Sequence, residues 1–233
     1  MRTLAVIPAR GGSKRLPGKN VRPFLGVPLI AWSIRFALGY AGFDRVVVST
    51  DAPEIAAVAA AEGIEVPRLR PAHLASDTAA TIDAVLDVIG HEAAQGRQFD
   101  TVALLQPTSP IRLALRWDAA RDLLGDSEID AVVGVAPART HPFHTFSLGD
   151  RGQLTSMHSA DLLKLRGQDL PAAVSVAGNL YLARTAALHE HRTFFPPRIA
   201  GVLCDQPFEA ADIDDELDWL IAETIATKYG ITP

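Results

Sequence analysis

The segment IPARGGSKRLPGKN, residues 7–20, combines the charge and the backbone freedom that a phosphate site needs. Three glycines let the backbone turn so that several N–H groups converge on one anion: Gly11, Gly12 and Gly18. Four side chains are positively charged: Arg10, Lys14, Arg15 and Lys19. An arginine holds two phosphate oxygens through its planar guanidinium, and a lysine supplies a mobile point charge. The segment therefore predicts a triphosphate site.

Two familiar glycine signatures do not fit this segment. It contains no G-x-G-x-x-G, and a P-loop would need a glycine in place of Ser13 and a Ser or Thr in place of Asn20. Dinucleotide enzymes and P-loop hydrolases are therefore disfavoured. The alternative left open by the residues is a solvated basic surface loop with turn glycines.

A second chemically suggestive group is the pair Asp212 and Asp214 of the sequence DID. In extended backbone, alternate side chains point to the same side, so both carboxylates can share one divalent ion while Ile213 points into apolar packing. The alternative is that Asp214 only caps the last helix and Asp212 is a surface charge. Together with a triphosphate loop, the pair predicts a Mg²⁺ site, because Mg²⁺ prefers carboxylate and phosphate oxygens.

Alternating strand and helix patterns are expected to position these residues. The expected strands are 3–7, 45–50 and 100–106, and the expected helices are 29–38, 53–63 and 78–95. This alternation predicts βαβ units and a doubly wound, mostly parallel sheet of the Rossmann-like α/β class. The loops that follow the strands, at 8–20, 49–51 and 106–110, should then lie along one edge of the sheet.

The alternation stops near residue 137. Two further strands are expected at 131–137 and 175–183, and the polar stretch between them contains Pro, Gly, Arg and His. We interpret about 138–175 as an arm inserted into a single domain that spans 1–233. A free loop of that length is uncommon in a compact domain, so the arm is expected to cross to a second copy of the chain.

The chain is expected to close with a helix whose start is capped by Asp214 or Asp215. The apolar face of this helix is expected to consist of Leu217, Leu220, Ile221 and Ile225. The same reasoning places Trp32 and Trp219 in the core and makes Cys204 an inert buried thiol.

Composition narrows the class of protein. A chain of 233 residues with 48% hydrophobic residues can bury a core, and a net charge of −5 disfavours a general nucleic-acid or membrane-surface binder. One cysteine permits no internal disulfide, and the apolar run at 4–7 is too short for a signal peptide or a membrane span. We therefore expect a cytoplasmic protein with no nucleic-acid partner and no membrane partner.

Seven segments resemble the acylneuraminate cytidylyltransferases, or CMP-sialic acid synthetases, including the bacterial CMP-nonulosonic acid synthetases. The segments are IPARGGSKRLPGKN, VVVSTD, LRPAHLASDTAAT, LLQPTSPIR, RGQDLP, GNLYLA and DIDDELDW, and they occur in the family's order over nearly the whole chain. The resemblance implies a doubly wound nucleotidyltransferase fold with a projecting dimerisation arm. It also implies an enzyme that uses Mg²⁺ to transfer CMP from CTP to the anomeric hydroxyl of a nine-carbon 2-keto acid sugar.

Position by position, the resemblance also implies roles for individual residues. The CTP site would contain Arg10, Ser13, Lys14, Lys19, Asn20, Arg70 and Thr81. The sugar site would contain Gln106, Arg166, Tyr181, Phe194 and Phe195, with Arg166 available for the sugar carboxylate. Asp212 and Asp214 would hold Mg²⁺ and, with Arg10 and Lys19, form the catalytic set.

Two departures leave the acceptor open. Members that use N-acetylneuraminate typically have a lysine in the HP segment of the arm, where this chain has His144, and Asn-Gly before the Tyr-containing strand, where it has Ala177 and Gly178. Acceptors related to legionaminic, pseudaminic or deaminated nonulosonic acids therefore remain possible.

Two other functions are weighed against this one. A CMP-Kdo synthetase has a similar RLPGK loop, but its metal-binding acid is expected after the central strand, where this chain has LLQPTSP. A non-catalytic nucleotide-binding protein of the same fold would not need the charged residues that are all present here.

Overall fold

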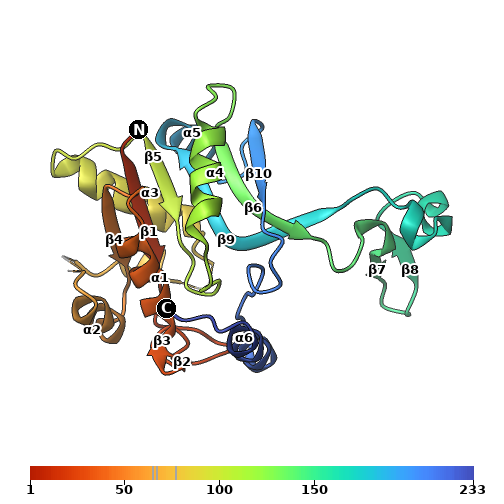
Figure 1. The fold of residues 1–233 in the computed structure, drawn as a ribbon, viewed down its shortest axis with the longest axis horizontal. Helices are drawn as coiled ribbons and strands as arrows, with labels where there is room; N and C mark the ends of the chain where they lie inside the picture. Colours follow the sequence, from red (N-terminus) through yellow and green to blue (C-terminus); the bar gives the residue numbers. More distant parts are fainter. Residues whose placement is uncertain (65, 67, 77) are drawn as a thin grey trace.

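The computed structural model describes residues 1–64, 66, 68–76 and 78–233 of the chain. Within them, six strands form the main sheet in the order β10-β6-β9-β5-β1-β4 (Figure 1). Their bounds are β1 (Thr3–Pro8), β4 (Arg45–Ser49), β5 (Thr101–Leu104), β6 (Ala131–Pro137), β9 (Val174–Arg184) and β10 (Ile199–Leu203). β1 pairs in parallel with β4 and β5, and β10 pairs in parallel with β6, whereas β9 is antiparallel to both of its neighbours. The predicted mostly parallel sheet is confirmed.

The central strand β1 determines where a ligand can bind. Its residues 3–7 are buried, as expected for a strand covered by helices on both faces. Within the sheet, β4 lies next to β1 on one side, and β5, which follows β4 in the chain, lies next to β1 on the other side. The strand order therefore reverses at β1. Ligands of open α/β sheets bind at such a reversal, beyond the carboxyl ends of the strands.

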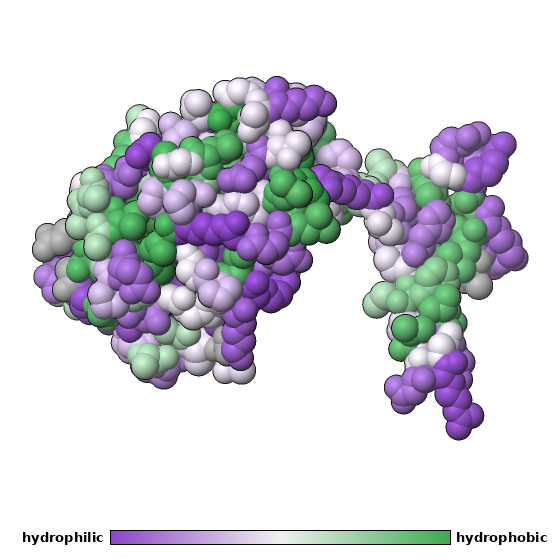
Figure 2. Space-filling model, turned by 90° about the horizontal axis from the view of Figure 1, so that it is seen from below, coloured by the Kyte–Doolittle hydropathy of each residue, from purple (hydrophilic) through white to green (hydrophobic). Residues whose placement is uncertain are grey.

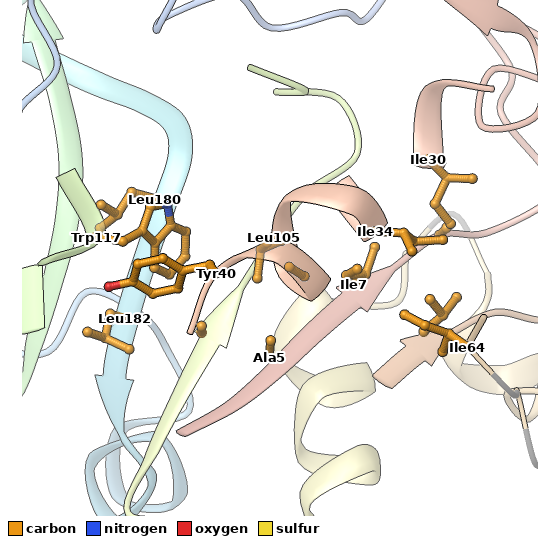
Figure 3. Packing of buried hydrophobic residues seen from close by; sticks show 14 of the residues in the cluster. Ala5, Ile7, Ile30, Ile34, Tyr40, Ile64, Leu105, Trp117, Leu180 and Leu182 are labelled. Carbon is orange, nitrogen blue, oxygen red and sulfur yellow. The ribbon is translucent and has the colours of Figure 1, made fainter. Parts of the chain in front are cut away.

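Helices cover both faces of the sheet. One face carries α1 (Leu29–Gly39), α2 (Pro53–Ala61) and α4 (Ala114–Leu124), and the other carries α3 (Thr81–Ala94) and α5 (Thr185–His191). Figure 3 shows the first of these cores, in which Ile30 and Ile34 of α1 and Trp117 of α4 pack over β1, β5 and β9. The sequence patterns did not identify α4, α5 or β10, and α3 begins three residues after the expected start at 78.

The final helix α6 (Glu216–Lys228) begins as expected but presents a different face to the core. Asp215 is its N-cap, and Asp218 completes a capping box. The expected apolar face is wrong for three of its four residues, because Leu217 and Leu220 are 64% and 62% exposed and Ile221 is also exposed. The fourth, Ile225, is half-buried against the core. The buried residues are Trp219, Ala222 and Ala226, which pack against the hairpin of β2 (Pro23–Phe24) and β3 (Val27–Pro28), among other neighbours. The buried face thus consists of one large ring and two alanines. The prediction missed this face because it relied on the leucine and isoleucine positions.

Residues 138–173, between β6 and β9, project from the end of the sheet, and we call them the arm (Figure 1). The arm contains a hairpin of β7 (Phe146–Leu148) and β8 (Leu154–Ser156) and three short 3-10 turns at 142–144, 160–164 and 167–169; another such turn, 72–74, lies in the main body. Figure 2 shows the arm joined to the main body by a thin connection. The arm can therefore contribute little to the core of its own chain.

No helix in the described part of the chain has both the length and the apolar character needed to cross a bilayer.

The orientation of α6 can be tested by comparing two neighbouring truncations. Trp219→Ala should lower the free energy of unfolding by about 3–5 kcal/mol, because the ring is buried against Phe24. Leu217→Ala should change it by less than about 0.5 kcal/mol, because that side chain is exposed. Urea unfolding measures both values, and equal losses would contradict the orientation described here.

Candidate active site

A cleft of about 410 Å³ lies at the carboxyl edge of β1 and β5. The loop after β1 forms one wall, the loop after β5 another, and the DID segment closes the cleft from the C-terminal side. The structure thus brings together residues that the sequence singled out from distant segments: Arg10, Ser13, Lys14, Lys19, Asn20, Arg70, Thr81, Gln106, Asp212 and Asp214.

Lys19 connects the first loop to the DID segment. Its Nζ donates to the carbonyl oxygen of Ile213 at 2.7 Å and lies 3.2 Å from Asp214 Oδ1, while Arg15 Nη2 lies 2.6 Å from Asp214 Oδ2. Burial alone would raise the pKa of Asp214, but the two cations outweigh it and lower that pKa below its usual value. Asp214 is therefore ionised at neutral pH.

The backbone at Ile213 places the two carboxylates in the cleft. The Ile213 side chain is fully buried in the α6 core, and its N–H donates to the carbonyl oxygen of Thr108 at 2.8 Å. Asp212 and Asp214 on either side both line the cleft. This is the arrangement expected from their spacing.

Asp212 is held by a second contact. Ser109 is fully buried and its Oγ donates to Asp212 Oδ1 at 3.3 Å. Gly178, at φ +81°, lies against Ser109: a Cβ there would stand 2.5 Å from Ser109 Oγ. Glycine is needed at 178 both for this backbone conformation and for this close approach.

The loop after β1 is held in shape by contacts of its own. The Asn20 side-chain amide donates to the carbonyl oxygen of Arg10 at 3.0 Å, and the Gly11 N–H donates to Asp51 Oδ1 at 3.0 Å. Asp51 therefore stabilises the loop from the end of β4. Because these contacts already order the loop, it loses little further conformational entropy when a ligand binds.

Arg70 forms part of the cleft wall near β4. Its side chain donates to the carbonyl oxygens of Ser49 and Leu74, at 2.5 and 3.3 Å. Burial lowers the pKa of Arg70, and Asp51 and Asp87 oppose that shift. The guanidinium fixes the polypeptide on both sides of it, so Arg70 shapes the wall as well as lining it.

Sequence reasoning missed Arg112, which organises the loop after β5. It donates to the backbone carbonyls of Gln106 at 2.7 Å, Asn179 at 3.1 Å and Pro110 at 3.3 Å, and to Ser33 Oγ at 2.9 Å. Burial lowers its pKa to about 9, and these partners are all uncharged. The sequence gives little sign of this role, because the partners of Arg112 are backbone carbonyls and a hydroxyl and not an acidic residue. The one available indication was an arginine in a Pro- and Ser-containing loop that follows a buried strand.

A second hollow of about 250 Å³ adjoins the cleft and shares Ala80, Thr81 and Gln106 with it. It contains the predicted aromatic residues, with the Phe194 and Phe195 rings edge-on to Tyr181 at centroid distances of 5.9 and 6.1 Å. Burial and the charge of Asp212 raise the pKa of Tyr181, so its hydroxyl is protonated and available as a donor.

Arg166 is not brought to this cleft by its own chain. It lies on the arm, exposed, and forms an ion pair with Asp169 at 2.6 Å. His144 is also on the arm and exposed, while Ala177 is buried in β9. Arg166 is therefore absent from the lining of both the cleft and the hollow beside it.

The donors in the cleft fit a Mg²⁺ ion. Asp212 and Asp214 supply carboxylate oxygens at one edge of a basic cleft. The described residues contain no group of three or more His, Cys, Asp or Glu side chains arranged for a metal. A Mg²⁺ held here would take its remaining ligands from phosphate oxygens and water, as this ion commonly does.

Comparison with known proteins identifies the family. Residues 4–123, more than half of the chain, match a family model described as Cytidylyltransferase. The chain belongs to the cytidylyltransferase family. The expected enzyme class, a nucleotidyltransferase, is thereby confirmed.

Curated relatives of this cytidylyltransferase align over most of its length. It is 37% identical over 227 residues to the CMP-N,N'-diacetyllegionaminic acid synthase of Legionella pneumophila, covering 97% of this chain and 96% of the relative. It is 35% identical over 200 residues to the pseudaminic acid cytidylyltransferase of Campylobacter jejuni, covering 84% of each chain. It is 30% identical to N-acylneuraminate cytidylyltransferase A of Danio rerio, covering 97% of this chain and 51% of that one. The resemblance inferred from the seven segments is confirmed.

A solved structure confirms the fold. The structure of a CMP:2-keto-3-deoxy-manno-octonic acid synthetase complexed with CTP superposes with a TM-score of 0.73, covering 98% of this chain and 100% of that one. The sequence identity is 17%, so this likeness establishes the nucleotidyltransferase fold alone.

The role assigned to Arg112 leads to a stability prediction. Arg112→Met should lower the free energy of unfolding by about 1–3 kcal/mol, because the carbonyls of Gln106 and Asn179 lose their donor. Methionine carries no charge, so the variant avoids the cost of burying one, and this gain in stability opposes the loss. Urea unfolding measures the balance, with the exposed arm residue Arg151→Met as a control that should change little. A variant as stable as the parent would show that the hydrogen bonds only offset the cost of burial.

Proposed function

We propose that this protein transfers CMP from CTP to the anomeric hydroxyl of a nine-carbon 2-keto acid sugar, a nonulosonic acid, and releases pyrophosphate. One observation supports this proposal most strongly: the basic loop and the Asp212–Asp214 pair line the same cleft. That cleft adjoins the hollow lined by Tyr181, Phe194 and Phe195, which we call the aromatic hollow. Relatives named for legionaminic, pseudaminic and N-acylneuraminic acids support the substrate class.

Nucleotidyl transfer requires the protein to align reactants and to stabilise charge. The acceptor hydroxyl attacks the α-phosphorus of CTP in line with the departing pyrophosphate, so the two substrates must meet where the two hollows join. Thr81 and Gln106 line both hollows and would contact both substrates there. Arg10, Ser13, Lys14 and Lys19 would neutralise the triphosphate, and Asn20 and Arg70 would bind the nucleoside.

In this proposal Asp212 and Asp214 hold Mg²⁺ at the phosphate edge. When bound, the ion supplies positive charge that offsets the charge developing on the phosphate oxygens. Ser109 orients Asp212, while Lys19 and Arg15 keep Asp214 ionised. The oxygens of Asp214 would be shared between these two cations and a bound Mg²⁺.

A CMP-Kdo synthetase is the enzymatic alternative, and it is less well supported. Relatives at 30–37% identity include ones named for legionaminic, pseudaminic and N-acylneuraminic acids, whereas the CMP:2-keto-3-deoxy-manno-octonic acid synthetase structure is 17% identical. The loop after β5 carries Gln106, Pro107 and Thr108 at the cleft and no carboxylate. A non-catalytic binding protein is disfavoured because Lys19 and both aspartates line one cleft.

We propose a homodimer joined through the arm, and a cytoplasmic location where CTP is available. The arm exposes large apolar side chains, with Leu148 73%, Leu154 64% and Met157 67% exposed. Arg166 lies on the same arm, so a second copy could receive it at its cleft, where the sugar carboxylate would lie. Burying this apolar surface between copies would supply the driving force.

The function is tested by mixing the protein with CTP, Mg²⁺ and a panel of acceptors. Neuraminic, legionaminic, pseudaminic and deaminated nonulosonic acids should include at least one acceptor that yields pyrophosphate and a CMP-sugar. Kdo should be turned over much more slowly. Turnover with Kdo alone would favour the alternative enzyme, and no turnover with any acid would favour a binding protein.

The aspartates are tested by removing one charge at a time. Asp212→Asn and Asp214→Asn should each lower turnover by roughly a hundredfold, comparable to loss of one well-placed electrostatic stabiliser. Lys19→Ala should weaken both CTP binding and turnover, because its charge acts on the ground state and the transition state. Pyrophosphate release is measured against Mg²⁺ concentration, with circular dichroism as the folding control. Near-normal turnover of both aspartate variants at low Mg²⁺ would remove them from the metal site.

The dimer is tested by light scattering at the concentration used for assays. The parent should have the mass of two chains, and Leu148→Glu combined with Leu154→Glu should shift it toward one chain because charges are costly in an apolar interface. A parent that is monomeric and fully active would overturn the proposal.

A further inference from the structure

Arg192 occupies an unusual backbone position at the wall of the aromatic hollow. It follows α5 and adopts the left-handed conformation, with φ 50° and ψ 39°. Leu25 is the one other non-glycine residue with positive φ in the described part of the chain. A left-handed residue with a long side chain is strained, and such strain is often retained where a side chain has a function. Asn or Gly would end this helix at lower cost.

An ion pair fixes the direction of the Arg192 side chain. Its Nη2 donates to Oδ1 of Asp83, which lies in the first turn of α3, directly after the hollow-lining residues Thr81 and Ile82. The pair thereby joins the loop after α5 to the helix that begins with Thr81. A guanidinium has five N–H donors in a planar fork. The Arg192 side chain is 62% exposed, so its remaining donors are accessible to a ligand.

The neighbours of Arg192 suggest what its donors meet. Arg192 lines the aromatic hollow together with Phe194, Phe195 and Tyr181. Phe195 is 52% exposed, an accessible apolar surface beside a charged donor. A ligand group that contacts both the Arg192 guanidinium and the Phe195 ring needs an oxygen that accepts a hydrogen bond and, next to it, a small apolar substituent. The acylamino group of a sugar, with its carbonyl oxygen and methyl group, has this chemistry.

The sugar carboxylate is another group that Arg192 could bind, but the orientation of the sugar excludes it. Asp212 and Asp214 line the cleft and not the aromatic hollow, whereas Arg192 lines the hollow and not the cleft. In a 2-keto acid the carboxylate is attached to the anomeric carbon, so it stays with the reacting hydroxyl at the cleft. Arg192 therefore faces a part of the sugar remote from the reaction.

We propose that Arg192, held by Asp83, is a specificity-determining residue that donates a hydrogen bond to the carbonyl oxygen of an acylamino group on the acceptor. The inference rests on the proposed function and extends it to one substituent. It assigns this chain a preference for N-acylated acceptors over counterparts that carry a hydroxyl at the same carbon, because a hydroxyl offers a smaller acceptor and no methyl group for Phe195.

The test compares two acceptors in the full-length protein, N-acetylneuraminate and its deaminated counterpart. Arg192→Asn removes the guanidinium while keeping a residue that tolerates the left-handed backbone. We expect its kcat/KM to fall about tenfold for the N-acylated acceptor and less than about threefold for the hydroxyl counterpart, with the KM for CTP unchanged. Arg192→Lys, which keeps one charged donor group, should recover part of the loss, and Asp83→Asn should lose less than Arg192→Asn.

Arg68→Asn is the matched control. It breaks an exposed ion pair between Arg68 and Asp87, also on α3, at 2.7 Å and away from the aromatic hollow. Its ratio of kcat/KM values for the two acceptors should equal that of the parent. Parent turnover of either acceptor tests the proposed function separately from this comparison.

A selective loss in Arg192→Asn, absent from Arg68→Asn, supports the inference. Equal losses for both acceptors in Arg192→Asn would overturn it, because a merely structural pair would affect both. A parent that prefers the deaminated acceptor would also overturn it while leaving the proposed reaction intact.

Discussion

The contact between Lys19 and the DID segment is the interaction on which the site depends. Its Nζ hydrogen bonds to the Ile213 carbonyl and to Asp214 join parts of the chain separated by more than 190 residues. The same junction is supported from the apolar side, where Leu16, Ile213 and Trp219 share one core, and from the surface, where Arg22 lies over the Trp219 ring at 4.3 Å. The basic loop and the acidic pair therefore face each other because α6 packs against the segment that follows the loop.

The loop after β5 completes this arrangement at a cost. Arg112 is a buried cation without an acidic partner, and it holds the Gln106 carbonyl together with that of Asn179. A hydrophobic residue there would cost less to bury, but it could not satisfy these carbonyls. The buried charge therefore fixes the position of a loop that both hollows share. Cys204 is also buried, and burial raises the pKa of its thiol to about 11, so that group stays neutral.

The sequence was sufficient wherever local pattern and chemistry agreed. The buried run of β1 and the glycine-rich loop predicted a ligand site at the carboxyl edge, and the spacing of Asp212 and Asp214 predicted that both would lie on one side of Ile213. It failed where tertiary packing decided the outcome. The buried face of α6 depends on a Trp and two alanines fitting a hairpin, and the role of Arg112 depends on carbonyls that no residue type reveals. The sequence likewise did not reveal that Arg166, on the projecting arm, is absent from the lining of both the cleft and the hollow beside it.

We propose above all that this cleft holds a triphosphate beside two carboxylates. The most direct measurement is the calorimetric affinity of the protein for CTP and for CMP, each in the presence of Mg²⁺, in the parent and in Lys19→Met. The parent should bind CTP at least about tenfold more tightly than CMP, a difference of about 1.4 kcal/mol, and Lys19→Met should lose much of this preference. Equal affinities for CTP and CMP in the parent would contradict it.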